Sequence, residues 1–209
     1  MPPTSPTVVV VDDDISIRES LELLIQNQGW QPALFESAQA FLARLPSVVP
    51  SCLILDVNLP DLSGLDIQQR ISDEKSSTPI IFITGYGDIP TSVRAMKAGA
   101  AEFLTKPLNY EVIIQAIRDA VLRSQTNLKR EDAQRQLQER FALLTKREHE
   151  VMNLVVKGLM NKQVGFELGI SEITVKAHRG KVMEKMRANT LVDLVNMAGR
   201  LGIGTAREA

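Results

Sequence analysis

Residues 52–61, Cys-Leu-Ile-Leu-Asp-Val-Asn-Leu-Pro-Asp, decide how this chain folds. The run opens with four apolar residues, which is typical of a strand buried on both faces of a parallel sheet. Asp56 comes where this strand should end, and Ser63 and Gly64 then start a helix. In open α/β sheets, ligands and reacting groups lie outside the carboxyl ends of the strands. Asp56 is therefore at a position where functional residues are found. A single Asp in this place is nevertheless more often a loop residue or a helix cap.

Strands and helices alternate on both sides of this stretch. Further runs with the composition of strands occur at 7–11, 31–35, 79–84 and 101–105. Apolar residues at helical spacing predict helices at 15–28, 37–45, 63–73, 89–98 and from 110 onward. Five such units in about 120 residues predict an α/β fold with a doubly wound, five-stranded parallel sheet and helices on both of its faces.

The composition is that of an ordinary globular protein, with 44% hydrophobic and 23% charged residues among 209. No run of about 18 apolar residues is present, and the N-terminus lacks a basic-then-apolar signal pattern. The single cysteine, Cys52, excludes an internal disulfide. These features predict a cytoplasmic protein without a membrane span.

Charge is distributed unevenly along the chain. Residues 1–124 carry 9 Lys and Arg against 15 Asp and Glu, a net charge of −6. Residues 125–209 carry 15 against 10, a net charge of +5. An acidic half that handles a cation and a basic half that handles nucleic acid would account for this division, although a charge excess is more often solvated surface.

Polar side chains gather where the predicted strands end. Right-handed crossovers bring the carboxyl ends of parallel strands to one rim of the sheet. Each residue there has an ordinary explanation when taken alone, as a helix cap, a strand terminus or a surface lysine. Their convergence favours a functional site. The residues at this rim are Asp12, Asp13, Asp56, Thr84 and Lys106.

The three carboxylates predict a metal site, because clustered negative charges repel one another unless a cation lies between them. Oxygen ligands with open water positions suit Mg²⁺ or Mn²⁺. We expect Asp13 to bind the ion directly and Asp12 to bind it through water. Asp56 would give one oxygen, and the backbone carbonyl of Asn58 another.

Asp56 is the expected phosphoacceptor, because a carboxylate beside such an ion can attack phosphorus. Lys106 and Thr84 would then donate to the phosphoryl oxygens. An alternative is a Mg²⁺-dependent phosphatase of the haloacid-dehalogenase type, which also uses a strand-end Asp. That chemistry usually needs a second Asp two residues later as general acid, where this chain has Asn58.

The motifs at these strand ends identify a family. Residues 7 to about 124 resemble the receiver domain of two-component response regulators. The matching features are Val11-Asp12-Asp13, Leu55-Asp56 with Pro60 and Gly64, Ile83-Thr84-Gly85, Met96 to Ala100, and Lys106-Pro107. The resemblance implies a flavodoxin-like strand order, 2-1-3-4-5, and phosphorylation of Asp56 by a sensor histidine kinase.

The resemblance also assigns roles to residues around Asp56. It implies that Thr84 and Phe103 are switch residues, with Phe103 swinging inward after phosphorylation. It implies a cis peptide bond before Pro107. Asn58 and Tyr86 fall where the family varies and tunes dephosphorylation.

Residues 125–140 predict a helical linker, because no Gly or Pro interrupts residues 121–145. Its apolar residues are sparse, which favours a polar, solvated helix. The alternative is a signalling helix that pairs between protomers. Such pairing needs about three heptads with clean core positions, and the sequence lacks them.

Residues 141–209 predict a second, all-α domain of four helices. Thr145 and Glu148 form a capping-box pattern, and Gly169-Ile170-Ser171 joins two short helices as in a helix-turn-helix. A basic helix is by itself as often a solvated face, but the turn and the capped neighbouring helices favour DNA binding. The second of the two short helices carries Lys176, His178, Arg179, Lys181 and Lys185.

Residues 144–201 resemble the LuxR-type helix-turn-helix of NarL/FixJ response regulators. The matching run includes Leu144-Thr145, Arg147-Glu148, Gly158-Leu159, Asn161-Lys162-Gln163, Leu168 to Ser171, and Thr174 to Lys176 with His178. The resemblance implies that Lys176 and Ala177 face the major groove, with Lys181 on the same helix. It implies that phosphates or the groove edge are held by Asn161, Lys162, Thr174, His178 and Arg179. Gly165, where relatives usually have Ala, and Gly180 inside the recognition helix depart from the pattern.

We therefore expect a transcriptional regulator of a bacterial two-component system, not a conventional enzyme. Residues 1–124 form the expected receiver, and 141–209 the DNA-binding domain. Phosphorylation should promote homodimerisation and place two recognition helices on a two-fold DNA site. The expected partners are a sensor histidine kinase, double-stranded DNA, a second copy of the chain and RNA polymerase, with no membrane. The remaining alternative is a DNA-binding dimer that works without phosphorylation.

Overall fold

The computed structural model describes residues 5–44, 50–73, 78–85 and 87–203. The chain forms two compact units, Met1–Leu128 and Lys129–Ala209. Within the described residues, no helix is long and apolar enough to cross a membrane.

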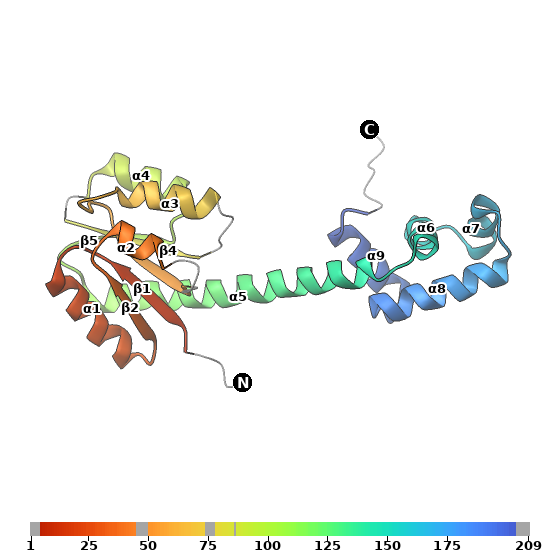
Figure 1. Cartoon of the computed structure of the whole chain (residues 1–209), viewed down its shortest axis with the longest axis horizontal. Coiled ribbons are helices and arrows are strands. Elements are labelled where there is room, and N and C mark those ends of the chain that lie inside the picture. Colours follow the sequence, from red (N-terminus) through yellow and green to blue (C-terminus); the bar gives the residue numbers. More distant parts are fainter. Residues whose placement is uncertain (1–4, 45–49, 74–77, 86, 204–209) are drawn as a thin grey trace. The chain divides into compact units, whose positions relative to one another are not determined.

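The first unit is built around a parallel sheet with the strand order β2-β1-β3-β4-β5 (Figure 1). This confirms the predicted order. The strands β3 (Cys52–Asp56) and β4 (Ile80–Thr84), which end in Asp56 and Thr84, are buried at every position. Their unbroken apolar runs predicted this burial. The strands are β1 (Thr7–Val11), β2 (Gln31–Phe35), β3 (Cys52–Asp56), β4 (Ile80–Thr84) and β5 (Glu102–Thr105).

In the described residues, helices cover both faces of this sheet, which is the doubly wound arrangement. Alternate strand residues build two separate cores, because successive side chains point to opposite faces. One core joins the strands to α1 and α5, and the other joins them to α2, α3 and α4. The helices are α1 (Ile15–Asn27), α2 (Ala38–Leu42), α3 (Gly64–Asp73), α4 (Ile89–Lys97) and α5 (Tyr110–Ala142).

Side-chain caps fix where these helices start. Asp14 accepts the backbone N–H of Ser16 at 2.8 Å, so the third Asp of the run caps α1. Asp88 caps α4 in the same way through Thr91 at 2.6 Å. The helix expected over 37–45 is shorter, because α2 ends at Leu42, and residues 45–49 lie outside the described part of the chain.

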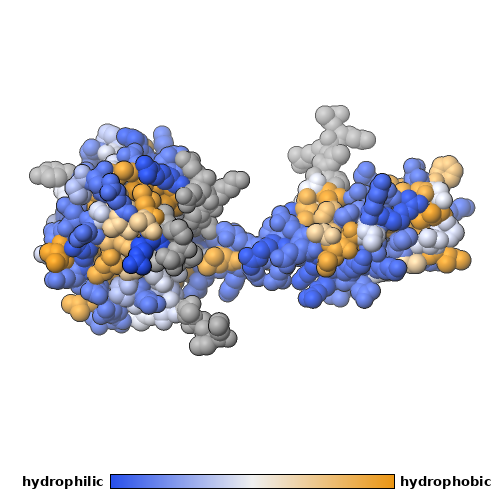
Figure 2. Space-filling view, viewed as in Figure 1, coloured by the Kyte–Doolittle hydropathy of each residue, from blue (hydrophilic) through white to orange (hydrophobic). Residues whose placement is uncertain are grey.

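The helix α5 continues without a break from Tyr110 to Ala142, as the absence of Gly and Pro predicted. Its second half presents a mainly hydrophilic surface (Figure 2). Near its end, Leu137 is buried in the core of the second unit, and Phe141 packs against that core. The end of this helix therefore belongs to the fold of the second unit.

Up to residue 203, where the described part of the chain ends, the second unit forms the helices α6 (Lys146–Val155), α7 (Asn161–Leu168), α8 (Glu172–Met186) and α9 (Leu191–Arg200). The predicted capping box opens α6: Glu148 accepts the N–H of Thr145 at 2.8 Å, and Thr145 accepts that of Glu148 at 3.3 Å. Gly169 ends α7 with a left-handed φ of 65°. A Cβ on Gly165 would lie 2.7 Å from the backbone oxygen of Ile170, so a glycine lets the turn approach α7 closely. These features make α7 and α8 a helix-turn-helix.

Candidate functional site

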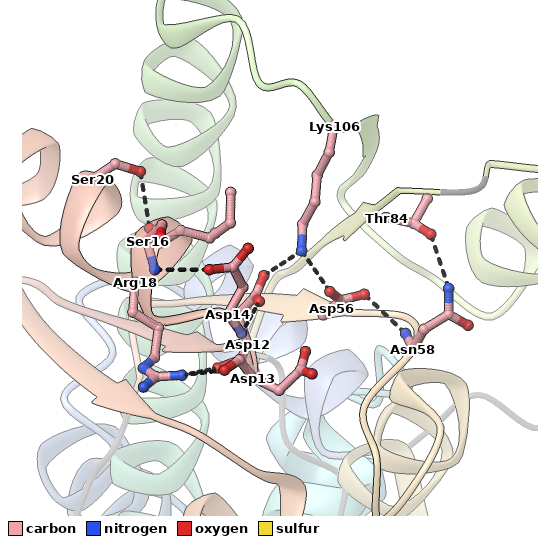
Figure 3. Close-up of polar contacts among 11 residues, drawn as sticks. Asp12, Asp13, Asp14, Ser16, Arg18, Ser20, Asp56, Asn58, Thr84 and Lys106 are labelled. Atoms are coloured by element: carbon pink, nitrogen blue, oxygen red, sulfur yellow. Dashed lines mark hydrogen bonds and ion pairs between the residues drawn. The ribbon is translucent and has the colours of Figure 1, made fainter.

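The sheet brings the predicted rim residues together at the carboxyl ends of its strands (Figure 3). Asp12 and Asp13 follow β1, Asp56 ends β3, and Thr84 ends β4. The side chains of Asp12, Asp56 and Thr84 are buried, whereas Asp13 is exposed. Ligand oxygens of the three carboxylates all lie within 4.8 Å of one another. The rim is therefore a cluster of carboxylates in which Asp13 is open to solvent.

Lys106 bridges two of these carboxylates from the loop after β5. Its Nζ lies 2.6 Å from Asp56 Oδ2 and 2.7 Å from Asp12 Oδ2. The backbone N–H of Lys106 donates to the carbonyl of Thr84 at 2.8 Å, and the Lys106–Pro107 peptide bond is cis. Burial alone would lower the pKa of Lys106, but the two carboxylates outweigh it and raise that pKa above its ordinary value. The ammonium is thus held charged between the two carboxylates.

Asp12 has room for a further positive partner. Its Oδ1 accepts the N–H of Asp14 at 2.9 Å. Its buried Oδ2 contacts Lys106 Nζ at 2.7 Å, which leaves a second lone pair of this oxygen available. Burial raises the pKa of Asp12, against the opposing effects of Lys106 and the Asp14 N–H. A buried carboxylate oxygen with a free lone pair, beside two further carboxylates, fits a hard divalent cation.

Asp56 is held by both of its oxygens. Oδ2 contacts Lys106, and Oδ1 accepts the backbone N–H of Asn58 at 2.9 Å. The start of α3 also packs against its backbone, because a Cβ on Gly64 would lie 2.4 Å from the Asp56 carbonyl oxygen. The sequence marked Gly64 as a helix start and as one of the features that resemble a receiver domain. Its closeness to Asp56 is a requirement of the site that no local pattern reveals.

The two switch residues predicted from the resemblance lie on β4 and β5. Thr84 Oγ1 accepts a hydrogen bond from Asn58 Nδ2 at 3.3 Å, so the Asn58 side chain contacts the predicted switch hydroxyl. Phe103 is half-buried, with its ring centroid 6.2 Å from that of Phe82. Tyr86 lies outside the described residues.

Arg18 is a part of the site that sequence reasoning missed. Its Nη1 donates to the carbonyl of Asp12 at 2.7 Å and to that of Asp13 at 2.9 Å. These bonds hold the backbone of the acidic loop from the first turns of α1 (Figure 3). The signal in the sequence is only a basic residue five positions after Asp13, which ordinarily marks a solvated helix face.

The helix α8, which is the second helix of the helix-turn-helix, is capped and basic. Ser171 accepts the N–H of Thr174 at 3.1 Å, and the two hydroxyls lie 2.8 Å apart. Lys176, Ala177 and Lys181 are exposed. Lys176 makes a loose ion pair with Glu172, at 3.6 Å, that leaves its side chain 65% exposed. These side chains are accessible to a ligand.

Other basic residues of α8 are used inside the unit. Arg179 is half-buried and donates from Nη1 to Asn161 Oδ1 at 3.1 Å, which ties two predicted DNA contacts to each other. His178 is half-buried, whereas Lys162, at the start of α7, is exposed. Lys185 contacts Glu148 at 2.6 Å and the carbonyl of Leu143 at 3.1 Å. Lys185 is therefore a structural residue.

Comparisons with known proteins match both units. The family model described as "Response regulator receiver domain" matches residues 8–118. The model described as "Bacterial regulatory proteins, luxR family" matches residues 142–198. Together the two models cover most of the chain.

Similar proteins match along nearly the whole length. Nodulation protein W of Bradyrhizobium diazoefficiens is 49% identical over 96% of this chain and 88% of its own. Transcriptional regulatory protein FixJ of Azorhizobium caulinodans is 40% identical over 99% and 98%. The solved structure of response regulator StyR has a TM-score of 0.85 at 42% identity, over 94% of this chain and 99% of its own. Full-length FixJ from B. japonicum has a TM-score of 0.58 at 38% identity, over 95% and 98%.

Proposed function

This chain belongs to the two-component response regulators with a LuxR-type DNA-binding domain, and we propose that phosphorylation of Asp56 controls its binding to DNA. It is a FixJ-like transcriptional regulator, not a conventional enzyme. The observation that carries the proposal is the convergence of Asp12, Asp56, Thr84 and Lys106 at one rim of the sheet. The alternative of a phosphatase accounts for the rim but not for the second unit.

The proposed donor is the phosphohistidine of a sensor kinase. A carboxylate oxygen of Asp56 attacks phosphorus, the new P–O bond forms as the P–N bond breaks, and the imidazole leaves. Lys106 already contacts Asp56 and can donate to a phosphoryl oxygen. Asp12, Asp13, Asp56 and the backbone carbonyl of Asn58 would hold Mg²⁺ or Mn²⁺, which supplies positive charge for the transfer.

The switch uses the Thr84 hydroxyl. Its oxygen accepts a hydrogen bond from Asn58, and a phosphoryl group on Asp56 would offer a charged acceptor to its proton. Thr84 then turns toward the phosphoryl oxygens, and Phe103 moves inward. The surface formed by α4, β5 and α5 changes, and two receivers dimerise. This is a two-state element biased by a local charge.

Dimerisation places two recognition helices on DNA. Lys176 and Ala177 are accessible on α8 and would face the major groove, with Lys181 beside them. Asn161, Lys162, Thr174, His178 and Arg179 would lie at phosphates or the groove edge. The half-sites would be separated by about one helical turn.

The proposed division assigns residues 1–124 to the receiver, 125–140 to the linker and 141–209 to DNA binding. A receiver implies a histidine kinase as partner, and a helix-turn-helix implies DNA. We propose that the protein works in the cytoplasm, as a homodimer when phosphorylated, and that it contacts RNA polymerase.

Asp13→Ala should weaken Mg²⁺ binding and phosphorylation by acetyl phosphate together. Loss of even an indirect metal partner costs about 10–100-fold in affinity, so the loss of a direct ligand should cost at least about tenfold. Calorimetric titration with Mg²⁺ and a labelling time course measure the two effects. Asp14→Ala is the matched control, because Asp14 caps α1 and stands outside the cluster. A variant at position 13 that keeps both properties would remove Asp13 from the ligand set.

Lys176→Ala should lower DNA affinity by about 1–3 kcal/mol if this lysine contacts a base. Binding of the full chain to DNA is measured with and without beryllofluoride, a phosphoryl mimic. Wild type should bind more tightly with the mimic, and its binding should fall steeply with salt. Lys129→Ala removes the same charge from exposed α5 and should bind like wild type. The proposed function fails if the mimic changes nothing and Lys176→Ala binds like wild type.

A further inference from the structure

We infer that the outward face of α8 recognises thymine methyl groups, through apolar contacts made by Ile173 and Ala177. Gly180 lets this face approach the base edges closely. The inference rests on the proposed DNA binding and adds the base chemistry that the site would recognise. The inference is drawn from three observations: the exposure of these residues, their positions on the helix and the open space at Gly180.

The outward face of α8 is defined by the residues that the core leaves out. Val175, Val182 and Met186 are buried against the rest of the unit. At 3.6 residues per turn, the side directly opposite is occupied by positions spaced four and then three apart. These are Ile173, Ala177 and Gly180, and all three are exposed. We call them the outward strip.

Ile173 is the unusual member of the strip. Its large apolar side chain is 80% exposed in the first turn of α8. Single exposed apolar residues are ordinary on protein surfaces. This one lies in the N-terminal part of a recognition helix, which is the part that contacts base edges.

The strip offers no hydrogen-bonding side chain over two turns of helix. Among the groups that base pairs present in the major groove, the one that suits an apolar contact is the C5-methyl of thymine. Lys176 and Lys181 flank the strip, one on each side, and both are exposed. A lysine at either edge can contact a guanine or a phosphate, and the apolar centre between the two lysines is left to contact methyl groups. Glu184 follows on the same face one turn beyond Gly180, outside the N-terminal part of the helix.

The fold itself gives no reason for a glycine at position 180. A Cβ there would meet nothing within 4 Å, and the backbone φ is not in the left-handed region. A glycine inside a helix lowers stability relative to alanine. The absence of a side chain instead leaves the strip flat where a base pair would approach it.

The test uses the full chain activated with beryllofluoride. Wild-type protein first selects duplexes from a random pool, and each thymine of a selected duplex is then replaced by uracil, which removes only the methyl group. We expect affinity to fall about fourfold at one or more positions in each half-site, as for a buried methyl group. Ile173→Ala should bind less tightly and should lose the penalty at the position that Ile173 contacts.

Two further variants sharpen the test. Ile173→Val keeps a branched apolar side chain and should retain a uracil penalty. Phe166→Ala removes another exposed apolar side chain, 87% exposed on α7 and outside the strip, and should keep every penalty of the wild type. Neither change touches the core, so folding should be preserved.

The outcomes separate this inference from the proposed function. If the wild type selects a duplex but uracil carries no penalty, the inference is wrong and DNA binding stands. The same holds if Ile173→Ala keeps every penalty. If no duplex is selected over random DNA under activating conditions, the proposed function fails and the inference fails with it.

Discussion

Asp56→Asn should abolish phosphorylation of this chain and remove the response of its DNA binding to phosphoryl donors. An amide has no nucleophilic oxygen anion, and Asp56 is the buried carboxylate that Lys106 holds at the end of β3. The amide has nearly the same shape as the carboxylate. It can still accept the N–H of Asn58, so the first unit should stay folded.

Labelling by acetyl phosphate and DNA affinity, each measured for the full chain, check this expectation. Asp66→Asn is the matched control, because it makes the same chemical change at an exposed position on α3. It should be labelled at the wild-type rate. Labelling of Asp56→Asn at that rate would place the phosphoacceptor elsewhere.

Lys185→Met should destabilise the second unit by about 2–3 kcal/mol. The side chain of Glu148 is only 3% exposed, and Lys185 is its ion-pair partner at 2.6 Å. Removing one partner of a buried pair costs about 3–5 kcal/mol, and the 32% exposure of the Lys185 side chain reduces that figure. Hydrogen exchange in α6 and α8 of the full chain measures the effect.

Two comparisons test the cause of this destabilisation. Glu148→Gln combined with Lys185→Met should be less destabilised than Lys185→Met alone, because no buried charge is then left without a partner. Lys176→Ala, on the same helix, should leave hydrogen exchange unchanged. If Lys185→Met instead weakens DNA binding with no loss of stability, then Lys185 is a DNA contact.

The same pair predicts a dependence on pH. Burial alone would raise the pKa of Glu148, but hydrogen bonds from Lys185 and Thr145 outweigh it and lower that pKa below its ordinary 4.5. The contribution to stability is therefore fully present above about pH 4.5 and is lost as the pH falls through the lower value of the folded state. Unfolding measured between neutral and acid pH should show this loss in wild type, and less of it in Lys185→Met.

The contrast between Lys176 and Lys185 shows what the sequence could predict. Periodicity placed both lysines on one basic helix, and it predicted that helix and its cap. It could not separate an accessible lysine from one that pairs with Glu148, because that contact joins residues 37 positions apart. Pairings of this length depend on how helices pack, which no local pattern records.

The residues at the rim were easier to predict from the sequence than the hydrogen bonds that hold them in place. Parallel strands must end on one side of the sheet, so Asp56 and Lys106 could be brought together from topology alone. The bond from Asn58 to Thr84 and the bonds from Arg18 to the acidic loop were not predictable in that way. The Asn58 bond depends on side-chain rotamers. The Arg18 bonds depend on where α1 begins after the loop that follows β1.

The buried start of β3 gives the protein an internal reporter of unfolding. Cys52 is the only cysteine in the sequence, its side chain is fully buried, and burial raises the pKa of its thiol. An exposed thiolate attacks thiol reagents, so the reagents can modify this chain only when the central strand opens. The rate of modification therefore measures how often the sheet opens. Slower modification in the presence of beryllofluoride would measure how far phosphorylation stiffens the receiver.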